Sequence, residues 1–344
     1  MRIKKWLPVA GAILLVGWAF WRLAGPAPQA VAAAPTLAQS GPAYPSPGTA
    51  PAPDPVVPVP PSAPVAQDDP DSPSIARARD AWCEEIVPRL PGTPQQRCQE
   101  GRYVPGKGRS VQGRSLWYTD IPATSGTRPL RVLVLGAIHG DEMSASTLVF
   151  DWVRRAREHP APGIVWRMAP LVNPDGLLHS PPTRVNAHGV DLNRNFPTED
   201  WVAKAAHYWE KTTRKDPRRF PGPSAASEPE TSWVLDQIGE FRPDLVVSVH
   251  APYGLLDFDG PQKPPSKLGS LFLDQLGVYP GSLGNYGGLV RGVPVVTIEL
   301  KHESRIAEAE SGAMWGDLLR WIDTRLKREP AAAPAAATQA AAVN

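Results

Sequence analysis

Arg131-Val-Leu-Val-Leu-Gly136, followed by His139-Gly-Asp-Glu142, is the stretch of sequence that decides the fold. Four consecutive apolar residues that end at a glycine predict a β-strand buried on both faces. Residues 143–158 then carry apolar side chains at helical spacing, with basic residues toward the C-terminal end, which predicts an α-helix. A strand that leads into a helix is the building unit of an α/β domain.

The same alternation of strand and helix continues along the chain. Further strands are expected at 164–172, 244–249 and 293–300, and further helices at 231–241 and 308–327. This order predicts an α/β domain with a largely parallel or mixed sheet.

Composition divides the 344-residue chain into five parts. Residues 26–73 contain fifteen prolines, and residues 329–344 are dominated by Ala and Pro. Such segments cannot bury enough apolar surface to offset the entropy of ordering them, so both are predicted to be disordered. Residues 74–103 are expected to form a short helical lead-in, and residues 104–328 are expected to form one domain with a substantial core. Residues 1–25 are a separate targeting segment.

The targeting segment is expected to take the chain out of the cytoplasm. Three basic residues precede the 16-residue apolar run Trp6–Trp21, which is the pattern of a secretory signal. Ala30-Val-Ala32 offers a cleavage site, although it lies far beyond the run. The run is slightly short for a membrane span, which needs about 20 residues. A cleaved signal peptide and an uncleaved anchor both stay open, and we favour the anchor.

The chain has two cysteines, Cys83 and Cys98. In an oxidising compartment such an isolated pair is expected to form a disulfide. Closing a loop of about 15 residues contributes about 3 kcal/mol in the chain-entropy model. The alternative is a pair of buried thiols.

The charge of the chain argues against one class of partner. The formal net charge is +2, 20% of residues are charged, and no long basic run lies inside the predicted domain. A nucleic-acid-binding protein typically shows a basic stripe. We therefore expect no nucleic-acid partner, and we expect a monomer.

Residues with metal or acid–base chemistry lie at predicted strand ends, where sites form in open sheets. His139 and Glu142 can reach one metal ion, because imidazole nitrogen and carboxylate oxygen both bind Zn²⁺. Glu299 ends an apolar strand and needs a partner, a metal or a shifted pKa, because an unpaired buried carboxylate is costly. The simpler alternatives are a structural histidine at His250 and an acidic helix N-terminus at Glu142.

A loop rich in Pro and Gly carries hydrogen-bond donors for an anion. Arg184 is followed by Asn193 and Arg194, and arginine can bind a carboxylate through two hydrogen bonds. Either arginine taken singly could instead be a surface residue paired with a nearby acid.

These segments, in this order, resemble the zinc carboxypeptidase family over residues 104–328. The branch they resemble most is that of the murein peptide amidases. The motifs that carry the resemblance are Gly108-Arg-Ser-Val-Gln-Gly-Arg114, His139-Gly-Asp-Glu142, Val190-Asp-Leu-Asn-Arg-Asn-Phe-Pro197, His250-Ala-Pro252, Tyr279-Pro-Gly-Ser-Leu-Gly-Asn-Tyr286 and Thr297-Ile-Glu-Leu300.

The resemblance implies a three-layer α/β/α fold around a central mixed, largely parallel twisted sheet. It also implies one Zn²⁺ per chain, held by His139, Glu142 and His250, with a fourth position left for water. Glu299 would be the general base that activates this water. Arg184 would stabilise the oxyanion of the transition state.

The resemblance implies substrate contacts as well. Asn193 and Arg194 would bind a substrate carboxylate, and Tyr286 is the candidate for the tyrosine that closes over the substrate. One position departs from the family, because many digestive carboxypeptidases carry Arg where this chain has Asp141. That change argues against ordinary C-terminal peptide specificity.

The expected activity is hydrolysis of the γ-D-glutamyl–meso-diaminopimelate bond in murein peptides. An enzyme with this substrate would work in the periplasm, tethered to the inner membrane if the N-terminal segment is uncleaved. The alternatives are a conventional metallocarboxypeptidase and a zinc amidohydrolase that acts on N-acyl amino acids. A non-catalytic cell-wall binding module would be expected to have lost a metal ligand or the base, whereas every such position is filled.

Overall fold

The computed structural model describes residues 69–126 and 128–326. The expected targeting segment, residues 1–25, lies outside these ranges, as do residues 329–344 and most of the Pro-rich segment. No helix within the described ranges is both long enough and apolar enough to cross a membrane.

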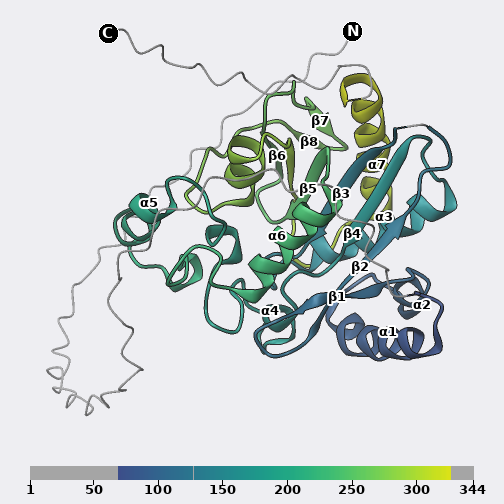
Figure 1. The fold of residues 1–344 in the computed structure, drawn as a ribbon, viewed down its shortest axis with the longest axis horizontal. Helices are drawn as coiled ribbons and strands as arrows, with labels where there is room; N and C mark the ends of the chain where they lie inside the picture. The colour runs from purple at the N-terminus through teal and green to yellow at the C-terminus, as the bar shows by residue number, and fades with distance from the viewer. Residues whose placement is uncertain (1–68, 127, 327–344) are drawn as a thin grey trace, which may run out of the picture. The chain divides into compact units, whose positions relative to one another are not determined.

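A seven-stranded mixed sheet forms the centre of the described domain (Figure 1). Its strand order is β1-β2-β4-β3-β5-β9-β6. The four central strands run parallel, and each edge is closed by antiparallel pairing. The predicted mixed, largely parallel sheet is therefore confirmed. The strands are β1 Val104–Arg109, β2 Ser115–Ile121, β3 Leu130–Gly136, β4 Ile164–Ala169, β5 Leu245–His250, β6 Leu255–Asp259 and β9 Val295–Glu299.

Helices cover both faces of this sheet, with α3 and α7 on one side and α6 on the other (Figure 1). The predicted helices 143–158 and 231–241 are observed as α3 and α6, and 308–327 is observed as α7 with a π-helical turn after it. The helices are α1 Pro73–Ile86, α2 Gln95–Gln99, α3 Met143–Glu158, α4 Pro174–Leu178, α5 Trp201–His207, α6 Pro229–Phe241 and α7 Glu308–Trp321. A two-stranded ribbon, β7 Lys267–Leu268 and β8 Leu271–Phe272, lies apart from the main sheet.

The apolar run of β3 explains why the sheet is covered on both sides. Val132 and Val134 belong to the core cluster that includes α3 and α7. Leu133 and Leu135 point to the other face and belong to the cluster that includes α6. Successive side chains of a strand point to opposite faces, so a run that is apolar on both faces needs a helix on each side.

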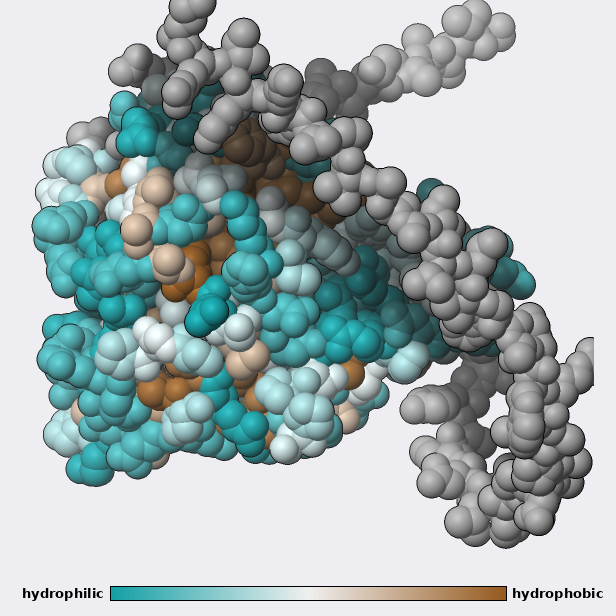
Figure 2. All heavy atoms as spheres, turned by 180° about the vertical axis from the view of Figure 1, so that it is seen from behind, coloured by the Kyte–Doolittle hydropathy of each residue, from teal (hydrophilic) through white to brown (hydrophobic). Residues whose placement is uncertain are grey.

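The outside of the domain has the opposite character. Figure 2 shows that the face turned away from the viewer in Figure 1 consists mostly of hydrophilic residues, with hydrophobic residues in separate patches. This contrast is the expected result of burying apolar area, which contributes about 25 cal/mol per Å².

The two cysteines join the two helices of the N-terminal lead-in, and an aromatic contact packs the lead-in on the sheet. Cys83 in α1 and Cys98 in α2 form a disulfide with a Cα–Cα distance of 5.8 Å. Both cysteines are fully buried beside Trp82, whose ring stacks on that of Trp117 in β2 at a centroid distance of 5.2 Å. The predicted disulfide is present, and free buried thiols are excluded for the described chain.

Loss of this disulfide should destabilise the protein. Replacing Cys83 and Cys98 by Ser removes a cross-link across about 15 residues and should lower the free energy of unfolding by about 3 kcal/mol. Denaturant unfolding of oxidised wild type and the double variant measures the difference, and reduced wild type serves as the control. An unchanged unfolding midpoint would contradict the expectation.

Candidate active site

The carboxyl ends of three neighbouring parallel strands converge on one edge of the sheet. β3 ends at Gly136 and leads to His139, β5 ends at His250, and β9 ends at Glu299. His250 and Glu299 are directly paired in the β5–β9 register. The strand order β3-β5-β9 therefore brings these side chains together, as expected for a site in an open α/β sheet.

His139, Glu142 and His250 form a tight cluster of possible metal ligands. Their ligand atoms all lie within 4.8 Å of one another. His139 Nδ1 lies 2.7 Å from Glu142 Oε1, and His250 Nδ1 lies 3.1 Å from both Glu142 Oε2 and His139 Nδ1. All three side chains are buried. No other such group of three or more was found within the described ranges.

The donor set fits a zinc ion. Zn–N bonds of 2.0–2.1 Å in a tetrahedral site place neighbouring donor atoms roughly 3.3 Å apart, close to the spacing seen here. The outer nitrogen of each histidine has a partner, because His139 Nε2 lies 3.0 Å from Asp191 Oδ1 and His250 Nε2 lies 2.9 Å from Ser248 Oγ. A histidine that donates a hydrogen bond from Nε2 carries no proton on Nδ1, so its Nδ1 is free to bind a metal.

The charge of Glu142 also suits a metal ligand. Burial alone would raise its pKa, but the charges and hydrogen bonds of His139 and His250 hold the pKa of this carboxyl well below its usual range. Glu142 is therefore ionised over the whole physiological range, as a carboxylate ligand must be.

Glu299 is the second buried carboxyl group at this edge. It is 6% exposed, and within the described residues its Oε2 atom is buried without a hydrogen-bond partner. Burial raises its pKa to about 8, and the negative charge of Glu142 adds to this shift. A carboxyl group held near neutral pKa in a cavity can accept and return a proton, which is what a general base does.

Arg184 lies between the metal-ligand cluster and Asp191. Its Nε donates to Asp191 Oδ2 at 3.0 Å, and its Nη1 donates to Glu142 Oε1 at 3.4 Å. Burial opposes its charge, but Asp191 and Glu142 raise the pKa of the guanidinium. Arg184 is 7% exposed and is not a surface arginine.

Arg194 forms no ion pair with an acidic side chain of the described residues. It is 7% exposed, its Nη1 donates to the Asn193 carbonyl at 2.6 Å, and its guanidinium lies 4.7 Å from the Tyr279 ring centroid. Burial and the charges of Arg184 and Arg219 lower its pKa, despite the opposing charge of Asp191. Among the described residues its Nε is buried without a hydrogen-bond partner. An unpaired buried cation indicates a binding place for an anion.

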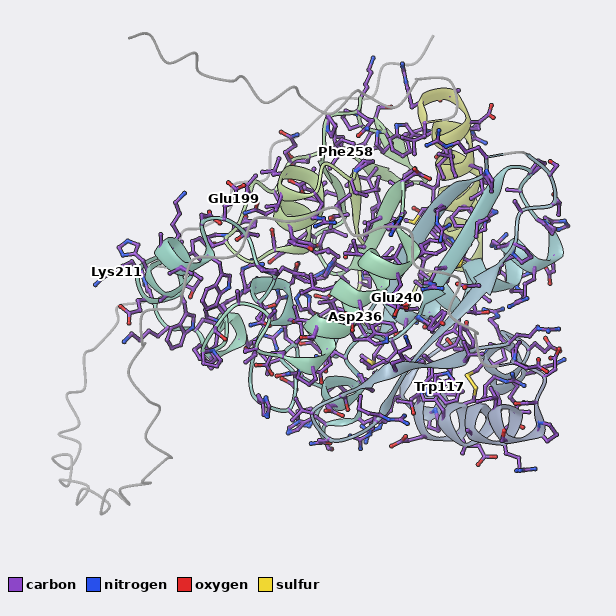
Figure 3. All side chains as sticks on the ribbon, in the orientation of Figure 1. Trp117, Glu199, Lys211, Asp236, Glu240 and Phe258 are labelled. Atoms are coloured by element: carbon purple, nitrogen blue, oxygen red, sulfur yellow. A yellow bond between two sulfur atoms is a disulfide. The ribbon has the colours of Figure 1, made fainter. Side chains whose placement is uncertain are left out.

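A cavity of about 270 Å³ joins these groups. His139, Arg184, Asn193, Arg194 and Glu299 all line it. The segment that contains Lys211, on the left of Figure 3, supplies Tyr208 and Thr212 to its wall. One cavity therefore joins His139 of the possible metal ligands, the buried carboxyl group of Glu299 and arginine side chains.

The sequence of this chain is similar to those of known proteins. The model of the zinc carboxypeptidase family matches residues 103–256. Murein peptide amidase A of Vibrio campbellii is 32% identical over 200 residues, which cover 56% of this chain and 77% of that protein. The chain belongs to the zinc carboxypeptidase family. This membership implies zinc, and the His139–Glu142–His250 cluster could bind it.

Two further similarities involve proteins with the same description. Murein peptide amidase A of Escherichia coli strain K12 is 32% identical over 170 residues, so the alignment covers 47% of this chain and 65% of that relative. The crystal structure of murein-tripeptide amidase from Escherichia coli O157 has 28% identity and a TM-score of 0.44, with 62% of this chain and 90% of that chain covered.

In this zinc carboxypeptidase family member, two residues that the sequence analysis did not assign contact the histidines of the possible metal site. Asp191 accepts from both His139 and Arg184, and Ser248 contacts His250. Ser248 could have been found, since residues two apart on a strand share a face. Asp191 lies inside the quoted Asp-Leu-Asn-Arg motif, but its partners are set by the tertiary fold.

Tyr286 does not line the cavity of the described structure. Its ring packs on Phe196 with a centroid distance of 6.0 Å, against the core cluster that includes α6. Tyr253 and Tyr279 line the cavity instead. Substrate contact by Tyr286 therefore stays an expectation.

Asp141 occupies the position at which this chain differs from many family members. It forms an ion pair with a segment that lines the cavity. Its Oδ2 accepts from Arg218 Nη2 at 2.8 Å, and the neighbouring Arg219 donates to the Tyr253 hydroxyl at 3.2 Å. Arg219 lines the cavity. A long-range ion pair thus brings a further arginine to the site from a segment with no recognisable motif.

Proposed function

We propose that the protein is a zinc-dependent amidase that hydrolyses an amide bond of murein peptides, the γ-D-glutamyl–meso-diaminopimelate bond. The observation that carries this proposal is Glu299, whose Oε2 has no hydrogen-bond partner among the described residues and which lines the same cavity as His139 of the two-histidine, one-glutamate cluster. Zinc carboxypeptidase family membership supports the hydrolytic chemistry.

The proposed mechanism assigns one task to each group in the cavity. A bound Zn²⁺ would act as a Lewis acid and lower the pKa of a water molecule to about 7. Glu299 Oε2 accepts a proton from the attacking water and passes it to the leaving amine. Arg184 faces the developing oxyanion, where preorganised positive charge stabilises the transition state.

Arg194 and Asn193 would orient the substrate. Arg194 is buried without an acidic partner, so a substrate carboxylate would complete its hydrogen bonding. Asn193 accepts from the Leu283 amide through Oδ1, which fixes the side chain beside Arg194. The resulting anion site lies in the same cavity as Glu299 and is suited to a carboxylate close to the scissile amide.

The choice of a murein peptide rests on relatives that carry that name. A conventional metallocarboxypeptidase would use the same base and the same arginines, and an N-acyl amino acid amidohydrolase would need a carboxylate site as well. Substrate identity therefore has to be decided by experiment.

Export to the periplasm is part of the proposal. The basic residues and the apolar run near the N-terminus support export, and the disulfide between Cys83 and Cys98 fits an oxidising compartment. We propose that the chain acts there as a monomer, tethered through its N-terminal segment.

One experiment separates these activities. The purified full chain is incubated with muropeptides, with plain peptides and with N-acyl amino acids, with and without a chelator, and the products are identified by mass. Release of meso-diaminopimelate that stops on chelation supports the proposal. Release of C-terminal residues from plain peptides alone would replace it with the conventional carboxypeptidase, and deacylation alone with the amidohydrolase.

The two arginines should separate binding from turnover. Arg194→Ala should raise KM by about 10- to 100-fold, the range for hydrogen bonds to charged groups, because it holds a carboxylate present throughout the reaction. Arg184→Ala should mainly lower kcat, because its charge matters most in the transition state. Steady-state kinetics measure both effects. Arg77→Ala, which changes an exposed arginine on α1, is the control. Equal effects on KM and kcat in both variants would contradict the division of roles.

A further inference from the structure

Two aspartates on β6 form a part of the cavity that the proposed mechanism does not use. β6 pairs antiparallel with β9, with Asp257 opposite Thr297. Since successive side chains of a strand point to opposite faces, Asp257 and Asp259 lie on the same face as Thr297 and Glu299. All four line the cavity. Phe258, labelled in Figure 3, lies between the aspartates and points into the core.

Neither aspartate is paired with a cationic side chain in the part of the chain that the structure describes. Asp257 is 7% exposed, and its Oδ1 accepts from the Phe258 amide at 2.8 Å. Burial raises the pKa of Asp257, and burial together with the charge of Asp257 raises the pKa of Asp259 to about 6. No described cation offsets these shifts in either group. A buried carboxylate without a counter-charge is costly, so the pair is suited to a ligand that brings a positive charge.

The chain backbone closes over this pair. A Cβ atom at Gly284 would collide with Asp259 Oδ2, and one at Gly288 would collide with the Asp259 Cβ. Two glycines therefore allow the segment 284–290 to approach Asp259 closely, and Gly284 lines the cavity together with Asp259.

The same cavity also carries positive charge. Arg194 and Arg219 both line it, and they are close enough for the charge of Arg219 to lower the pKa of Arg194. A cavity lined by both arginines and aspartates is suited to a ligand with a carboxylate and an ammonium group on one residue.

We propose that Asp257 and Asp259 bind the side-chain ammonium group of a diamino acid on the leaving side of the scissile amide, while Arg194 binds the carboxylate of that residue. This specificity rests on the proposed function, and it goes further by naming the residues that recognise the leaving amino acid. A neutral side chain would leave both carboxyl groups without a counter-charge, and sites built from buried polar groups reject analogues that cannot pair with them.

Three matched substrates test the assignment. L-Ala-γ-D-Glu carries meso-diaminopimelate, L-lysine or L-norleucine at its C-terminal end, and norleucine matches the lysine stem without the ammonium group. We expect wild type to cleave the first two at least about 10-fold more efficiently than the third. Asp257→Asn/Asp259→Asn should lower kcat/KM for both diamino substrates by about 10- to 100-fold and leave norleucine nearly unchanged.

Asp236→Asn is the matched control. Asp236 is exposed on α6, outside the cavity lining, and is labelled in Figure 3. This variant removes one negative charge and should leave all three substrates unchanged. An equal loss on all three substrates in the double variant, or no loss on any, would overturn the assignment. A second metal equivalent that disappears in the double variant would also overturn it, because the pair would then hold a cation of its own.

Binding of free amino acids separates this inference from the proposed function. Calorimetry of the full chain with L-lysine and with L-norleucine requires no turnover. We expect a preference for lysine that the double variant abolishes, even if no muropeptide is cleaved. Cleavage of muropeptides without any preference for lysine in kinetics or in binding would leave the proposed function standing and reject the aspartate subsite.

Discussion

Glu299→Gln should lower turnover of the proposed amidase by about 10²- to 10⁴-fold, the range that general acid–base catalysis contributes. Glutamine keeps the size of the side chain and most of its hydrogen bonding, but it cannot accept the proton of the attacking water. Because Glu299 is outside the His139–Glu142–His250 cluster, zinc should stay bound. Kinetics on muropeptides and metal analysis of the same sample measure both effects.

The control for this prediction is Glu303→Gln, which changes an exposed glutamate four residues further along the chain. It should retain wild-type turnover. If Glu299→Gln cleaves muropeptides at the wild-type rate, the proposed mechanism is wrong. If it loses zinc together with activity, Glu299 has a structural role at the metal site and the assignment as a base fails.

Metal-free protein gives a pH-dependent check on the same residue. The pKa of Glu299 is raised by burial from 4.5 to about 8 in the folded chain, so the folded state resists its ionisation. The stabilisation of the neutral form is complete below about pH 4.5 and is lost as pH rises through 8. In the absence of metal, the thermal stability of Glu299→Gln relative to that of wild type should therefore increase as the pH rises across this range. Parallel profiles would contradict the shift.

His250→Ala should abolish zinc binding and, with it, all activity. The variant leaves two of three protein ligands, and an open site with two ligands lacks the coordination that catalytic zinc sites require. Metal analysis of purified protein measures the loss directly. His159→Ala removes an exposed histidine beyond the C-terminal end of α3 and should retain the wild-type zinc content.

Ser248→Ala offers a milder version of this test. The hydroxyl lies 2.9 Å from His250 Nε2 and fixes the orientation of the ring. Loss of such a partner typically costs 10- to 100-fold in metal affinity or activity. A full zinc complement in His250→Ala would refute the ligand assignment, whatever the result for Ser248→Ala.

Much of the site could be predicted from short stretches of sequence. The apolar strand before His139, the helix after Glu142 and the apolar strand that ends at Glu299 are all visible as local patterns. The periodicity of a buried strand or an amphipathic helix depends on neighbours in the chain, so it can be read without the fold. The disulfide followed from the presence of a single cysteine pair and the expected export.

Other parts of the site were decided by tertiary structure alone. The strand that carries Asp257 and Asp259 was not predicted, because aspartate is depleted in strands. It is a strand because β9 provides a pairing partner for it. Tyr286 packs on Phe196 rather than lining the cavity, and Asp141 meets Arg218 across 77 residues.

The sequence by itself therefore determined the α/β framework, the order of its central strands and helices, and the residue types at the strand ends. The tertiary structure decided which side chains meet at the site: Asp191 contacts His139, and Arg219 and the aspartate pair line the same cavity as Arg194. The physical reason is the range of the interactions. Hydrophobic periodicity is local, whereas ion pairs, edge-strand pairing and cavity walls join residues far apart in the chain, and no short pattern records which of them will meet.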